Sequence, residues 1–192
     1  MKKIVCILFA ILIVLSLTAC KTIFGMDPGS DGKEKGAASR PDADGMYDVG
    51  DFTVFIPDGW TTIPVPDSND PSKILTNDIQ LAKGALYNET SDTWNTEDGV
   101  SFYVTYLLPE DFEGVSGARD YYARNFAVTD MEDLTIGDLT WHGFLVRPIG
   151  APVYMMWAER TDGNGGYYTS ISTAYGMSLE DADIRAILGS LK

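Results

Sequence analysis

The sequence predicts an α+β protein that has a single antiparallel β-sheet with helices packed against it. Most of its apolar segments are short and rich in β-branched and aromatic residues, which favour strands. Only two stretches carry apolar residues at the three- and four-residue spacing of a helix. A chain in which strands predominate and helices are few forms one sheet that the helices cover, so we expect this architecture.

The strands are predicted from alternation and from turn residues. Phe52 to Ile56 alternates and stops at the turn Pro57-Asp58-Gly59, after which Trp60 is expected to fold back into the core. The prolines of the stretch 61–71 favour a loop. Further strands are expected at 79–82, 100–108, 134–141 (a hairpin around Gly137-Asp138), 141–149, 153–160 and 167–173, the last two joined by the glycine-rich turn 162–166.

Two helices complete the prediction. Ser116 can cap a helix that runs to Phe126. The chain closes with a helix from Ser178, and its apolar residues form one stripe: Ile184, Ile187, Leu188 and Leu191. A stripe of this kind packs against the sheet, so both helices are expected to cover it.

The first 19 residues have the three parts of a secretory signal peptide. Lys2 and Lys3 give a positive start, an apolar run follows from Ile4 to Leu17, and small residues precede Cys20. The run is about fourteen residues long, shorter than the roughly 20 that span a bilayer. Leu17-Thr18-Ala19-Cys20 resembles the lipobox of bacterial lipoproteins. The resemblance implies cleavage before Cys20, lipid attachment to its thiol, and a chain held on the outer side of a cell membrane; an uncleaved N-terminal membrane anchor is the alternative.

Residues 20–45 are predicted to be a flexible tether between the lipidated cysteine and a folded domain at 46–192. The tether is rich in glycine, proline, serine and charged residues, with only Ile23, Phe24 and Met26 as sizeable apolar side chains. Such a segment buries too little surface to offset the entropy of ordering it. The sequence therefore predicts three parts: signal peptide, tether and one α+β domain.

Charge and cysteine content exclude several functions. The formal net charge is −14, and removal of Lys2 and Lys3 with the signal peptide leaves 12 basic and 28 acidic residues, a net charge of −16. Phosphate binding needs basic patches, so we expect no nucleic acid partner. Cys6 lies in the signal peptide and Cys20 carries the lipid, which excludes cysteine nucleophiles, disulfides and cysteine-bound zinc from the domain.

The sequence offers few candidate site residues. Asp67 and Asp70 lie in a polar turn that could hold a cation, and Trp94 and Asp98 lie in a polar segment that could contact a ligand. A solvated turn, and a tryptophan packed onto the sheet, are the alternatives. His142 is the one histidine, and no Gly-x-Ser-x-Gly motif accompanies it. The segment from Asp162 begins like a calcium loop but has Thr173 where a bidentate Glu would be needed. We therefore expect no enzyme activity, cofactor or metal.

The domain resembles the PsbP-like family, which includes PsbP, the Mog nuclear-import factor and many bacterial lipoproteins. The resemblance is carried by Ile56-Pro57-Asp58-Gly59-Trp60, the tyrosine-rich helix, the hairpin at Ile136-Gly137 and the closing Ile-Leu-Gly-Ser-Leu-Lys segment at 187–192. It covers residues 47–192 and implies an α/β/α sandwich with a role in protein binding or assembly. No functional residue of the family transfers to this chain.

Two functions follow as hypotheses. In the first, the chain is a membrane-anchored extracytoplasmic lipoprotein whose domain is a non-catalytic interaction or assembly module for an envelope protein. In the second, it is an envelope lipoprotein that binds a small ligand or a cation at Trp94, Asp98, Asp67 and Asp70. A contiguous exposed apolar patch would favour the first, and converging polar groups would favour the second.

Overall fold

The structure is a computed structural model of the 192-residue chain, and it describes residues 45–84, 86–88, 93–95, 101–112, 114–148, 152–173 and 178–192. Its contacts divide the chain into two compact units, Met1–Ala37 and Ala38–Lys192, and all described residues belong to the second. The predicted signal peptide, Cys20 and nearly all of the tether lie outside the described residues. No helix within the described ranges is long and apolar enough to cross a membrane.

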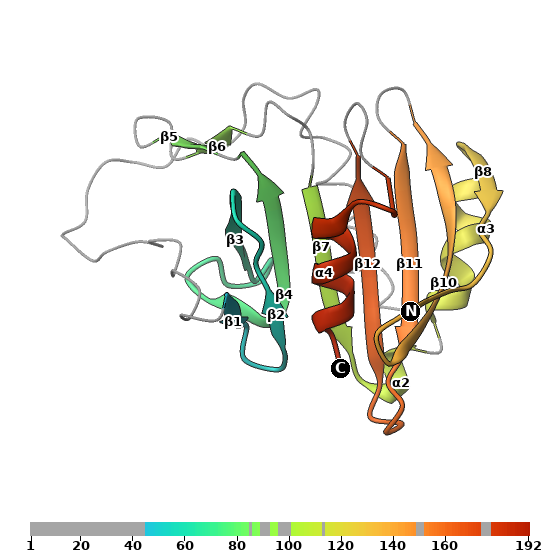
Figure 1. The fold of residues 1–192 in the computed structure, drawn as a ribbon, viewed down its shortest axis with the longest axis horizontal. Helices are drawn as coiled ribbons and strands as arrows, with labels where there is room; N and C mark the ends of the chain where they lie inside the picture. The colour runs from blue at the N-terminus through green and yellow to red at the C-terminus, as the bar shows by residue number, and fades with distance from the viewer. Residues whose placement is uncertain are drawn as a thin grey trace. The chain divides into compact units, whose positions relative to one another are not determined.

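A large antiparallel sheet of eight strands dominates the fold, as the sequence predicts (Figure 1). The strand order is β3-β4-β7-β12-β11-β10-β8, and β9 pairs with β10 beside this path. The strands are β3 (Trp60–Pro66), β4 (Ile74–Lys83), β7 (Ser101–Leu107), β8 (Ala127–Asp130), β9 (Leu134–Ile136), β10 (Leu139–Arg147), β11 (Val153–Glu159) and β12 (Gly166–Ser172).

The prediction of a single sheet is wrong, because two small sheets accompany the large one. β1 (Met46–Asp48) pairs with β2 (Thr53–Phe55), and β5 (Leu86–Asn88) pairs with β6 (Thr93–Asn95). Alternation in the segment 52–56 correctly marks a strand. It does not say which strand becomes the partner, and here β2 pairs locally and packs on α4 (Ala182–Ser190).

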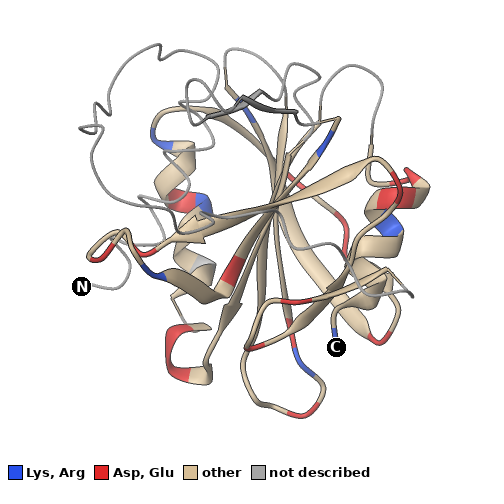
Figure 2. Ribbon diagram, turned by 90° about the vertical axis from the view of Figure 1, so that its left-hand side faces the viewer, with Lys and Arg blue, Asp and Glu red and all other residues tan. Residues whose placement is uncertain are grey.

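Helices lie on both faces of the large sheet (Figure 2). α4 lies on one face together with β1 and β2. α3 (Ala118–Ala123) lies on the other, where the Tyr122 ring is 6.0 Å from the ring of Phe144. A short α2 (Pro109–Phe112) and a 3₁₀ turn η1 (Val115–Gly117) precede α3. Among the described elements, α3 thus covers the β10 side of one face, and α4 with β2 covers the other face.

The main hydrophobic core lies between the sheet and α4. Asp181 caps the helix by accepting a hydrogen bond from the Asp183 backbone N–H at 3.0 Å, a geometry that satisfies an otherwise free donor of the first turn. Ile184, Ile187 and Leu188 are completely buried. Trp60 is buried in this core, as predicted, and its Nε1 donates to Asp183 at 3.0 Å.

β3 was expected to be a loop because of its prolines. Proline lacks the backbone N–H that a central strand needs, but an edge strand tolerates it. β3 is an edge of the large sheet, and it pairs only with β4, with a register shift between Pro64 and Pro66. The strand expected at 79–82 is correspondingly longer, since β4 begins at Ile74.

Three further boundaries differ from the sequence prediction. The helix expected from Ser116 to Phe126 is divided into η1 and α3 and ends at Ala123. β8, which forms the other edge of the sheet, was not predicted. The last helix begins at Ala182 instead of Ser178, because Asp181 provides the cap.

Candidate functional site

The predicted acidic loop 67–70 satisfies its own oxygens. Asp67 accepts hydrogen bonds from the backbone N–H and the side-chain amide of Asn69, at 2.8 and 3.2 Å. Asp70 accepts from the Ser72 hydroxyl at 2.6 Å and pairs with Lys73 at 3.2 Å. The pKa of Asp70 is lowered by these interactions, and the hydrogen bond from the Ser72 hydroxyl contributes most. The loop is thus built as a pair of turns between β3 and β4.

The other predicted site residues are only partly covered by the structure. The backbone of Trp94 lies in β6, opposite Tyr87 in β5. Nothing is described of the Trp94 side chain, and Asp98 and Cys20 lie outside the described residues. Within the described ranges, no group of three or more His, Cys, Asp or Glu side chains could hold a metal ion.

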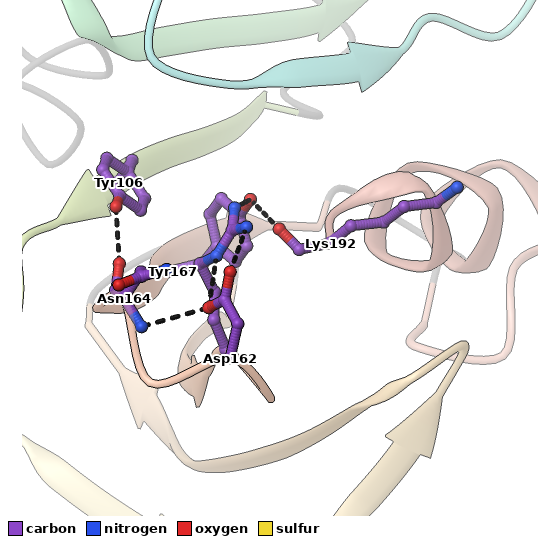
Figure 3. A network of polar contacts seen from close by, with 6 residues as sticks. Tyr106, Asp162, Asn164, Tyr167 and Lys192 are labelled. Atoms are coloured by element: carbon purple, nitrogen blue, oxygen red, sulfur yellow. Dashed lines mark hydrogen bonds and ion pairs between the residues drawn. The ribbon is translucent and has the colours of Figure 1, made fainter.

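A network around Arg160 closes the hairpin between β11 and β12 (Figure 3). The guanidinium binds the Asp162 carboxylate through Nη2 at 2.8 Å and the Tyr167 hydroxyl through Nη1 at 3.2 Å. Tyr167 in turn donates to the backbone carbonyl of Lys192 at 2.5 Å. The hydrogen bond from Arg160 lowers the pKa of Asp162. Every one of these groups has a partner within the protein, so the network stabilises the hairpin. The expected hairpin turn at 162–166 is confirmed.

His142 also has a structural partner. Its Nδ1 lies 2.7 Å from the Asp133 carboxylate, and its side chain is 46% exposed. The nearest ring contact is Trp157, 6.2 Å away between centroids.

A different set of polar residues lies on the sheet face opposite α4. Strand pairing places Asp78 opposite Thr105, Thr105 opposite Tyr168, and Tyr103 opposite Ser170. Alternate residues of a strand point to opposite faces. Phe102, Val104 and Ile171 belong to the core beneath α4, so the five intervening residues point to the other side. We call them the polar cluster: Asp78, Tyr103, Thr105, Tyr168 and Ser170.

Several polar atoms of this face are buried and lack a hydrogen-bond partner. Seven such side-chain atoms occur in the described part of the chain, and five of them lie on or above this face: Asp78 Oδ1, the hydroxyls of Tyr103, Tyr168 and Ser170, and the hydroxyl of Tyr122 in α3. Tyr103, Tyr168 and Ser170 are only 7%, 2% and 1% exposed. Buried polar groups of folded proteins nearly always have a partner, so a concentration of exceptions on one face demands an explanation.

Burial sets the electrostatics of the polar cluster. It raises the pKa of Asp78 above its ordinary value, and the nearby hydroxyls of Thr105 and Tyr103 offset only part of this rise. Burial and the Asp78 charge together raise the pKa of Tyr103, and burial raises those of Tyr168 and Tyr122. The phenols therefore stay neutral at any physiological pH, and Asp78 is the one carboxyl group of the cluster.

Sequence reasoning missed the polar cluster, although a signal was present. Strands β7 and β12 are buried on both faces, yet every second residue in their middle is polar or a tyrosine: Tyr103 and Thr105, then Tyr168 and Ser170. β4 repeats this spacing with Asp78 and Gln80. In β4 and β7 apolar residues separate these polar ones, whereas in β12 Thr169 lies between Tyr168 and Ser170, so the pattern is clear in two of the three strands and indicates a shared polar face once the strands are neighbours.

The chemistry of the cluster suits binding better than bond making. It offers hydroxyl groups, which both donate and accept, and one carboxyl group. Ser170 has no histidine beside it to act as a base, because the one histidine of the chain pairs with Asp133. A polar molecule held between these groups would satisfy the partnerless atoms.

Comparison with known proteins gives no family assignment. No family model matches the chain, and no curated protein matches it. Among solved structures, the crystal structure of a protein from Bacteroides thetaiotaomicron VPI-5482 aligns with 73% of this chain at 12% sequence identity and a TM-score of 0.41. The chain spans 44% of the length of that protein. This likeness carries no argument about the fold or the function.

Proposed function

We propose that the chain is a lipid-anchored extracytoplasmic lipoprotein whose domain binds a small polar ligand at the polar cluster, without catalysis. The observation that carries the binding role is the concentration of buried, partnerless polar atoms on one sheet face. A bound molecule supplies the hydrogen bonds that the protein leaves unmade, each of which would otherwise cost about 1–3 kcal/mol. The anchoring role rests on the basic start, the apolar run and the cysteine at position 20.

The hypothesis of an interaction or assembly module for an envelope protein is less well supported. The exposed large hydrophobic residues in the described part of the chain are Ile74, Leu108 and Tyr121. They belong to the start of β4, the residue after β7, and α3. Protein-docking patches are contiguous apolar areas of several hundred Å². Residues from three separate elements are weaker support for such a patch than five polar atoms on one face are for a ligand site.

The PsbP-like assignment of residues 46–192 forms part of the proposal. It is supported by the residues named above and by the helices on both faces of the sheet (Figure 2). An experimental structure superposed on PsbP-like domains tests it, and a different strand order would contradict it.

The ligand site is tested by a crystal structure of the full chain. We expect non-protein density within hydrogen-bond distance of the Tyr168 and Ser170 hydroxyls. If these hydroxyls instead bond only to other protein groups, the binding role is wrong.

The anchor is tested by labelling cells with a fatty acid that carries an alkyne. The wild-type chain should take up the label, and Cys20→Ala should abolish uptake and leave an uncleaved precursor. Cys6→Ala is the matched control, since it removes the other cysteine of the chain and should leave labelling unchanged. Labelling that survives Cys20→Ala would contradict the proposed attachment site.

A further inference from the structure

Asp78 forms no ion pair with a lysine or arginine among the residues that the structure describes. The lysine and arginine side chains of the described residues that form ion pairs do so with other acids, namely Lys73 with Asp70, Lys83 with Asp183, Arg119 with Asp120 and Asp130, Arg160 with Asp162, and Arg185 with Glu180. Lys83, although it lies on β4 like Asp78, turns to Asp183 of α4 on the opposite face. A carboxylate removed from water and left without a counter-charge is costly, so buried charges are normally paired.

The groups around Asp78 accept hydrogen bonds without adding charge. The Thr105, Tyr103, Tyr168 and Ser170 hydroxyls each have lone pairs to offer, and three of these four residues have hydroxyls that lack a partner. An ammonium group has three donors and no acceptor. Its donors can therefore meet one carboxylate and two hydroxyl oxygens at once.

The aromatic rings favour the same kind of ligand. Tyr103 and Tyr168 belong to the cluster, and the buried ring of Tyr122 lies over the same face of the sheet, 6.0 Å from the ring of Phe144. The electron-rich face of a tyrosine ring attracts a cation that has lost its water. A calcium or magnesium ion is a poorer match, because these ions take six or more oxygen ligands with several carboxylates among them. An anionic ligand is also a poorer match, because the negative charge of the Asp78 carboxylate would repel it.

We propose that the polar cluster binds a small organic cation through its primary ammonium group, with Asp78 as the counter-charge and two of the three partnerless hydroxyls, those of Tyr103, Tyr168 and Ser170, as the further acceptors. This inference rests on the proposed binding function and names the class of its ligand. The acidic chain as a whole also favours the approach of a cation, since a net charge of −14 raises the local concentration of positive solutes.

The test is calorimetric titration of the full chain in detergent with amines and with their neutral isosteres. The probes are ethanolamine, butylamine and 1,4-diaminobutane, each compared with the alcohol of the same length. We expect saturable binding of at least one amine and none of its alcohol. Asp78→Asn keeps the shape of the side chain and removes its charge, and it should weaken amine binding about 10- to 100-fold, as the loss of a charged hydrogen-bond partner does.

Asp70→Asn is the matched control, because it makes the same charge change at an acid that lies in the exposed turn before β4. It should leave amine binding unchanged, and the melting temperature of each variant reports that it folds. Failure of every amine to bind, or equal binding by Asp78→Asn, overturns the ammonium assignment. Equal binding of an alcohol and its amine would overturn it too but would leave the proposed function standing, whereas crystals without density at Tyr168 and Ser170 would remove both.

Discussion

Asp78 shows how one side chain can be retained at a cost to stability. Its carboxyl lies among neutral hydroxyls, and its Oδ1 is buried with no partner among the described groups. A chain selected for stability alone would place an apolar or neutral residue here. Positions that break a local rule without a visible compensation are concentrated at functional sites, so the placement of Asp78 agrees with a binding role.

Replacing Asp78 by Asn should stabilise the ligand-free chain at neutral pH. Burial raises the pKa of Asp78, so between the ordinary carboxyl pKa and the raised one the folded chain binds more protons than the unfolded chain. The stability from this group is therefore full below the ordinary pKa and is lost as the pH rises through the raised one. The free energy of unfolding, measured in urea from about pH 4 to about pH 8, should favour the variant increasingly as the pH rises.

Asp70→Asn is the control for this experiment, and its effect on the free energy of unfolding should depend on pH in the opposite direction. The pKa of Asp70 is lowered by the Ser72 hydroxyl and by Lys73, so its contribution is present above the ordinary pKa and is lost as the pH falls. The difference between Asp70→Asn and the wild type should thus shift against the variant as the pH rises. A difference curve for Asp78→Asn that is flat, or that follows the Asp70→Asn curve, would show that Asp78 is not a buried carboxyl group of raised pKa.

At the residue scale, the sequence predicted exposed acids better than buried ones. Asp67 and Asp70 lie close together in a polar turn, a pattern that is visible in the sequence. Asp78 lies between Asn77 and Ile79, a context typical of any half-exposed strand. Its neighbours Thr105 and Tyr168 come from strands 27 and 90 positions further along, and only the strand order brings them together.

Among the described glycines, Gly165 in the hairpin between β11 and β12 leaves the least room for a side chain. Gly165 has a φ angle of +89°, and a Cβ atom added there would lie 2.0 Å from the carbonyl oxygen of Leu107. Gly163 in the same turn has a φ angle of +72° but no atom within 4 Å of such a Cβ. An L residue would be strained at both positions. Only at Gly165 would its Cβ atom also collide with a neighbouring group.

Gly165→Ala should therefore destabilise the chain by about 2–5 kcal/mol, the sum of the left-handed strain and the cost of overpacking. Gly163→Ala, the matched control, should cost only about 1–2 kcal/mol from strain. Urea unfolding of the two variants measures the difference. Equal losses for both would mean that the turn moves away from Leu107 at no cost.

Elements were predictable where local chemistry decides them. Pro57 ends β2, the glycines of the segment 162–166 form a turn, and the stripe from Ile184 to Leu191 marks α4. β3 was missed because its prolines exclude a central strand, and only the finished sheet shows that β3 is an edge. Likewise, the residues of β2 indicate a strand but not its pairing with β1.

For the whole molecule, the dominant electrostatic property is an excess of acidic residues. The chain has 28 acidic and 14 basic residues, and acids are distributed over strands, turns and helix ends (Figure 2). Exposed ion pairs such as Arg185–Glu180 contribute little, about 0–1 kcal/mol each. Repulsion between the unpaired acids therefore outweighs them, and it is a long-range effect that salt screens.

Adding sodium chloride up to about 150 mM should raise the melting temperature at neutral pH, because the Debye length falls from about 30 Å in 10 mM salt to about 8 Å. For a chain of this size, each 1 kcal/mol of relieved repulsion appears as about 2–4 °C. Scanning calorimetry measures the effect. Near the isoelectric point of about 4.2 the net charge is zero, so added salt should no longer raise the melting temperature. A melting temperature that falls with salt at neutral pH would show that ion pairs dominate instead.

The overall architecture was predictable in its class and not in its details. The pairings at the centre of the large sheet join strands that are far apart in the sequence, since β7 pairs with both β4 and β12. Composition and alternation predict many strands and few helices, which makes a helix-covered antiparallel sheet the natural solution. They do not say which strands become neighbours, so the polar residues of β4, β7 and β12 are recognised as one cluster only when the strand order is known.

The proline-bearing edge of the large sheet has a consequence for molecules held close together in one plane. An open edge strand is a template on which a second copy can add its own strand, and crowding makes such addition more frequent. β3 offers no amide donor at Pro64 or Pro66, and its register shifts between them, so an incoming strand cannot form a regular ladder. The opposite edge, β8, is only four residues long. Both edges of the large sheet are thus poor templates for a strand added by a neighbouring copy.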